Sequence, residues 1–139
     1  MPEWGSVPHY YGDVVRIIFL ICAIVVGLLA PLSGSVGVGL VIAMPIVLVL
    51  IILAGFTNPH STFVMILDTI AAVLGILIAE TYAVVAFASE EMLVFLTFEA
   101  IVFMLFVALY FSAKNVRAAM MHKIGKTDSP SEFDGTTSQ

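Results

Sequence analysis

Four long apolar runs take up most of this 139-residue chain and constrain its fold more than any other feature. They cover residues 14–30, 36–55, 63–88 and 91–112. An α-helix needs about 20 apolar residues to span the roughly 30 Å hydrocarbon core of a bilayer. The runs are continuous, whereas the strands of a membrane barrel alternate apolar and polar residues. The pattern predicts an all-α, polytopic membrane protein with four transmembrane helices in an antiparallel bundle.

Composition supports lipid as the natural solvent of the chain. Hydrophobic residues make up 61% and charged residues 11%, against about 45–50% and about 25% in soluble domains. A soluble domain of this length buries too small a share of its surface to hide so much aliphatic area. Five basic residues without a basic stripe argue against nucleic acid as a partner. Membrane lipid is the expected partner instead.

The chain is expected to form one transmembrane domain over residues 1–126. A cytoplasmic helical extension is expected to continue the fourth span to residue 124. Residues 127–139 are rich in Ser, Thr, Asp and Gly and are predicted to be a disordered polar tail. The first run is interpreted as a retained helix, because the residues before it carry Glu3 and Asp13 and no Lys or Arg.

The basic residues predict the orientation of the four spans. Arg16 lies at the start of the first span, and the other four follow the last span, at Lys114, Arg117, Lys123 and Lys126. Four spans bring the two ends of the chain to the same side, so all five cations share one face. The positive-inside rule makes that face cytoplasmic, with both termini.

Two acids near the outer ends of the third and fourth spans are the leading candidate site. Glu80 and Glu99 each lie about 12 Å below the outer surface, at a rise of about 1.5 Å per residue. Two carboxylates at one level in a low dielectric cannot both ionise, so they predict a shared proton or a cation site. An equally weighted alternative is two protonated acids hydrogen-bonded to neighbours such as Thr81, Tyr82 and Thr97.

A third intramembrane acid, Asp68, lies near the cytoplasmic boundary at the depth of Arg16. An arginine can bind a carboxylate through two parallel hydrogen bonds. We therefore expect a structural ion pair that fixes the first helix against the third. The face of Asp68 continues through small residues at steps of three and four, which favours close helix packing: Ala72, Gly75, Ala79, Ala83 and Ala86.

Motifs of catalysis are lacking in the sequence. It has no Gly-x-Ser-x-Gly, no phosphate-binding loop and no His-Glu-x-x-His. His60 and His122 have no companion at ligand spacing, and His9 has only Asp13, four residues away, so neither an enzyme nor a metal site nor a cofactor is expected. The chain is expected to move or sense a small cation or proton through Glu80 and Glu99. The alternative is a structural or accessory subunit without transport, and either role suits a homo-oligomer or a membrane complex.

Several short strings carry a resemblance to known proteins: Tyr10–Arg16 (YYGDVVR), Thr57–Pro59 (TNP), Leu67–Asp68 and Ala108–Ser112 (ALYFS). Together they resemble an uncharacterised family of small four-span membrane proteins of candidate-phyla bacteria. That resemblance implies the bacterial inner membrane and no particular activity. A weaker one, carried by Leu67–Ile70 (LDTI), is to the small subunits of multisubunit cation/proton antiporters.

Overall fold

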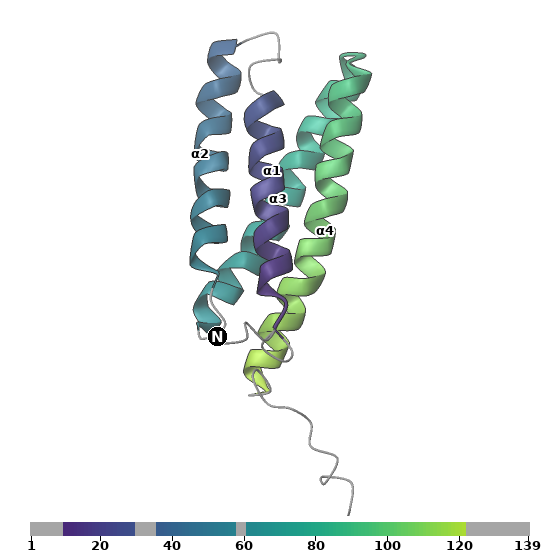
Figure 1. Cartoon of the computed structure of the whole chain (residues 1–139). Helices are drawn as coiled ribbons and strands as arrows, with labels where there is room; N and C mark the ends of the chain where they lie inside the picture. Colours follow the sequence, from purple (N-terminus) through teal and green to yellow (C-terminus); the bar gives the residue numbers. More distant parts are fainter. Residues whose placement is uncertain (1–9, 30–35, 58–60, 122–139) are drawn as a thin grey trace, which may run out of the picture.

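The computed structural model describes residues 10–29, 36–57 and 61–121, which form the four helices of Figure 1. They are α1 (Gly12–Leu29), α2 (Val36–Phe56), α3 (Thr62–Ala88) and α4 (Met92–Met120). The predicted all-α fold is confirmed. Three helices, α1, α3 and α4, are long and apolar enough to cross a membrane, and α2 contains a shorter apolar stretch, Val41–Phe56.

The ends of α3 and α4 follow from local chemistry. Ser61 caps α3, because its hydroxyl accepts a hydrogen bond from the Val64 amide at 3.4 Å. Between α3 and α4 only three residues intervene, and Glu90 adopts the left-handed conformation with a φ of 60°. This conformation is uncommon for a residue with a side chain. α4 then continues without a break to Met120, past the expected end of the span at 112. Residues 122–124 of the expected extension and the tail at 127–139 lie outside the described residues.

α3 and α4 form the most closely packed pair of helices, α1 packs against α2 and α4, and α2 touches α3 only slightly. Small side chains make the close approach of α3 and α4 possible, as their spacing predicts. Ala72 and Ala83 are fully buried. At Gly75, a Cβ atom would lie 3.0 Å from the Cδ1 atom of Leu105, so glycine allows α4 to pack directly against the backbone of α3.

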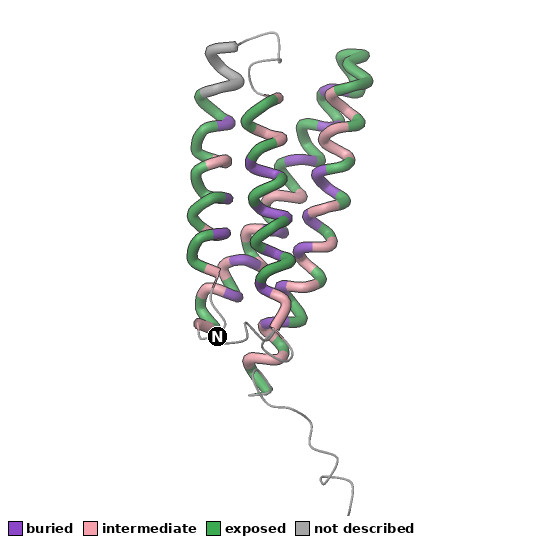
Figure 2. The backbone as a smooth tube through the Cα atoms, in the orientation of Figure 1, coloured by how far each residue is buried: buried purple, intermediate pink, exposed green. Residues whose placement is uncertain are grey.

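Large aliphatic side chains cover the outside of the bundle. Figure 2 shows buried residues on the inward faces of the helices and exposed residues around them. Leu28 and Val41, for example, are 66% and 74% exposed. Soluble monomers rarely expose contiguous apolar patches beyond a few hundred square ångströms. A surface of this kind is compatible with hydrocarbon as the surrounding solvent.

A polar contact ties the start of α1 to the end of α4. The Tyr11 amide donates a hydrogen bond of 2.8 Å to Asn115 Oδ1, and Asn115 is buried. The Tyr11 ring packs against Phe111 at a centroid distance of 5.4 Å. Lys114 Nζ lies 3.2 Å from the Tyr11 hydroxyl and 4.3 Å from the ring centroid. These contacts join segments that are 100 residues or more apart in the chain.

We predict that Asn115→Ala lowers the free energy of unfolding by about 1–3 kcal/mol, because it leaves the Tyr11 amide without its acceptor. Thermal unfolding in detergent micelles would measure the loss. Arg117→Ala is the matched control, since Arg117 is exposed on the same turn of α4. Equal effects of the two substitutions would contradict a specific role for the amide contact.

Candidate functional site

Glu80 and Glu99 lie at the same level of the α3–α4 pair. The rings of Tyr82 and Phe98 stack between the two helices at 5.5 Å with an interplanar angle of 17°. Glu80 is two residues before Tyr82 and Glu99 is one residue after Phe98. Glu80 is exposed, however, and Glu99 is half-buried, and neither carboxylate has a recorded hydrogen bond or ion pair with another described residue. Within one copy of the chain, the two acids do not form an enclosed site.

The neighbouring hydroxyl groups are engaged elsewhere. Thr81 Oγ1 donates to the carbonyl of Leu77 at 2.8 Å, and Thr97 Oγ1 donates to the carbonyl of Leu93 at 2.8 Å. Each bond stays within its own helix, four residues back, as is common for threonine in helices. A hydroxyl has a single hydrogen to donate, so these two threonines do not donate to the glutamates. Tyr82, the third expected partner, stacks on Phe98 instead.

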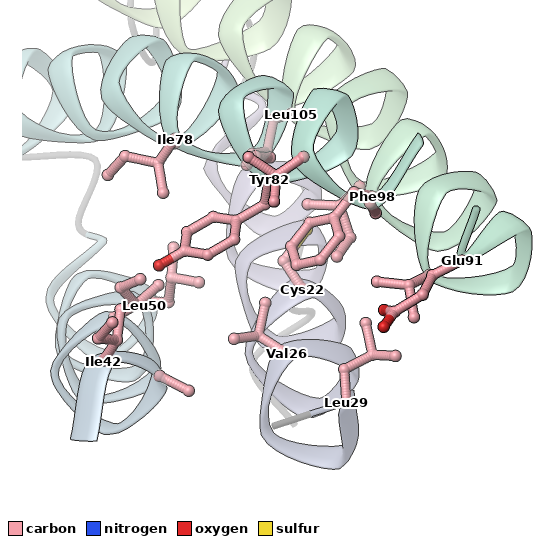
Figure 3. Close-up of a pocket in the computed structure, with 18 of the residues that line it drawn as sticks. Cys22, Val26, Leu29, Ile42, Leu50, Ile78, Tyr82, Glu91, Phe98 and Leu105 are labelled. Atoms are coloured by element: carbon pink, nitrogen blue, oxygen red, sulfur yellow. The ribbon is translucent and has the colours of Figure 1, made fainter. Parts of the chain in front are cut away.

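An apolar cavity of about 350 Å³ opens between α1 and α2 on one side and α3 and α4 on the other. It exists because α2 hardly touches α3 along this length. Its lining is aliphatic and aromatic except for Cys22 of α1 and for Ser89 and Glu91 at the α3–α4 connection. Figure 3 shows Tyr82 and Phe98 side by side on one wall and Cys22 and Val26 of α1 on another. Glu80 and Glu99 do not line this cavity, which suits an apolar group rather than an ion.

Asp68 is the most buried acid in the described part of the chain. It is 2% exposed, and its Oδ1 atom has no hydrogen-bond partner. Its Oδ2 atom lies 3.5 Å from the hydroxyl of Thr57, at the end of α2. Arg16, the expected partner, is exposed on α1, and the structure records no ion pair between the two side chains. Asp68 and Arg16 therefore lie in the same end of the bundle without the expected clamp between them.

Two polar residues of α4 join Asp68 in the interior, and the sequence analysis did not single them out. Ser112 and Asn115 are 1% and 3% exposed. Their signal in the sequence is the three-residue step that places both on one face of a helix. Together with Asp68, they are the buried polar side chains of the described residues. Asp68 lies near the start of α3, and Ser112 and Asn115 lie near the end of α4, where Asn115 contacts Tyr11 before α1.

Tyr10, which precedes α1, borders the same end. Its ring lies over Gly12, where a Cβ atom would overlap the phenol group. Burial, together with the nearby charges of Asp13 and Asp68, raises the pKa of Tyr10 to about 12.

No family model matches this chain, and comparisons with curated proteins and with solved structures find no match either. Within residues 10–29, 36–57 and 61–121, no three His, Cys, Asp or Glu side chains gather as a metal site. The function is therefore inferred from the placement of the acids and of the cavity.

Replacement of the exposed arginine tests the expected clamp. We predict that Arg16→Gln changes the free energy of unfolding by less than about 0.5 kcal/mol, as is usual for exposed residues without a partner. A broken buried ion pair would cost about 3–5 kcal/mol instead. Chemical unfolding in micelles distinguishes an exposed Arg16 from one paired with Asp68. A large loss that the swapped variant Arg16→Asp/Asp68→Arg restores would establish the clamp and contradict the structure.

Proposed function

We propose that the chain is a four-span protein of a bacterial inner membrane, with its helices antiparallel and both termini in the cytoplasm. Successive contacts of α3 and α4 support the antiparallel arrangement, because they advance along one helix as they go back along the other: Gly75 with Leu105, Tyr82 with Phe98, and Phe87 with Phe95. The described cations support the orientation. Arg16 and Lys114 belong to the end where Tyr11 contacts α4, and positive residues favour the cytoplasmic side.

The exposed carboxyl group of Glu80 is the observation that carries the functional proposal. Glu80 lies about 12 Å from the outer end of a 27-residue apolar helix. An acid facing lipid at such a depth costs about 2.5–3.5 kcal/mol on insertion scales, and such residues normally face protein or a wet cavity. We infer that another subunit covers this side of α3, which also carries Val73 and Val84 at helical spacing from Glu80.

A second copy of the same chain is the simplest subunit to cover Glu80. The Tyr82–Phe98 stack holds Glu80 and Glu99 at one level within each copy. In such a homo-oligomer, the interface between adjacent copies would enclose both acids at that level. Like carboxylates in a low dielectric hold a proton or a small cation between them. The function proposed is therefore the movement or sensing of a proton or small cation by an oligomer, with lipid as the other partner and without catalysis.

A second candidate is a structural or accessory subunit without transport of its own. The apolar lining of the cavity favours it, because ions require polar ligands or water along their path and this lining supplies few. In that case the same side of α3 would contact a different membrane protein, and a basic group of that partner would neutralise Glu80.

Flux across proteoliposomes tests the two candidates. We predict that the purified chain carries protons or alkali cations, and that Glu80→Gln and Glu99→Gln each abolish this flux by removing the charge while preserving the shape. Glu91→Gln is the matched control, because Glu91 lies at the start of α4 next to the connection. If the wild-type chain gives no flux at any pH with any cation tested, transport is excluded and the accessory role is favoured.

A further inference from the structure

The buried carboxyl group of Asp68 lacks a full set of hydrogen-bond partners. Its Oδ1 atom has no partner, and its Oδ2 atom has only the Thr57 hydroxyl at 3.5 Å, beyond the usual range of such bonds. Thr57 Oγ1 also lies 2.8 Å from the carbonyl of Leu53. The single hydroxyl hydrogen follows the shorter contact, so the lone pairs of Thr57 Oγ1 are left for another group. A carboxyl group 2% exposed is thus left without a donor.

The register of α3 and α4 places Ser112 at about the level of Asp68. Asp68 lies seven residues before Gly75 on α3, and Ser112 lies seven residues after Leu105 on α4. Since Gly75 and Leu105 are in contact and seven residues make about two helical turns, Asp68 and Ser112 share one level and both face inward. Ser112 Oγ donates its hydrogen to the carbonyl of Leu109 at 3.1 Å, so its lone pairs are also free.

The basic groups at this end of the bundle do not neutralise Asp68. The amino group of Lys114 contacts the hydroxyl and the ring of Tyr11. Arg16 is exposed and has no recorded ion pair with Asp68. Asn115, the other buried polar side chain here, uses its Oδ1 atom to accept the Tyr11 amide. None of these groups is recorded as a donor to Asp68, whose one recorded side-chain contact is the hydroxyl oxygen of Thr57.

We propose that Asp68, Thr57 and Ser112 form a binding site for a small monovalent alkali cation, of the sodium class, between the start of α3 and the ends of α2 and α4. Carboxylate, hydroxyl and carbonyl oxygens are the ligands that hard cations prefer. One carboxylate balances one positive charge, whereas calcium sites combine six to eight oxygens, commonly with several carboxylates. The site lies within one copy of the chain and does not involve Glu80 or Glu99.

Sodium-dependent stability is the direct test. We predict that NaCl raises the unfolding temperature of the detergent-solubilised full chain above that in choline chloride at the same ionic strength, because a ligand that binds only the folded state stabilises it. Equilibrium dialysis with radioactive sodium should show matching binding. Asp68→Asn should remove both effects, and Ser112→Ala, a smaller change, should weaken sodium binding about tenfold or more.

The variant Glu80→Gln/Glu99→Gln separates this site from the proposed function. It should bind sodium as the wild type does, whether or not it retains flux. The proposal is overturned if sodium gives no stabilisation beyond choline in the wild-type chain, or if Ser112→Ala and Asp68→Asn bind sodium unchanged. Stabilisation by acid alone, with no response to sodium, would show that a proton occupies Asp68 and would equally overturn the cation site.

Discussion

The close approach of α3 and α4 is the contact on which the rest of the molecule depends. Alanines and Gly75 let the two backbones pack with only the side chains of α4, such as Leu105, between them. In lipid, helices gain little by leaving an apolar solvent, so close packing of small residues supplies much of the association energy. This pair sets the relative levels of Asp68 and Glu80 on α3 and of Glu99 and Ser112 on α4. α2, by contrast, stands away from α3, and the apolar cavity is the result.

Two acids of the same helix therefore meet different surroundings. Glu80 follows Asp68 by 12 residues, which turns it about 120° around α3. Asp68 lies on the line of small residues that packs against α4, so it is buried, with the Thr57 hydroxyl as its recorded side-chain contact. Glu80 lies outside that line and remains exposed in a single copy. The first arrangement favours a site inside the monomer, and the second favours contact with another subunit.

The sequence predicts much of this structure, for physical reasons that vary from residue to residue. Apolar length identifies the helices, the spacing of small residues identifies the buried face of α3, and counting from a short connection puts Glu80 and Glu99 at one level. The depth of Glu80 and Glu99 does not show which way each side chain points. That direction depends on how α3 and α4 are rotated about their own axes. The Tyr11–Asn115 contact depends on how α1 docks on α4. Local sequence patterns contain no information on that docking.

Cysteine cross-linking in native membranes tests most directly whether a second copy covers the Glu80 side of α3. In a Cys22→Ala background, Val84→Cys places a thiol about 40° from Glu80 around the helix, and Leu74→Cys places one about 120° away. Val84 and Leu74 are similarly exposed, at 60% and 53%. We predict that oxidation links two copies through position 84 and not through position 74. Absence of a dimer at position 84, or equal cross-linking at both positions, would contradict the assembly.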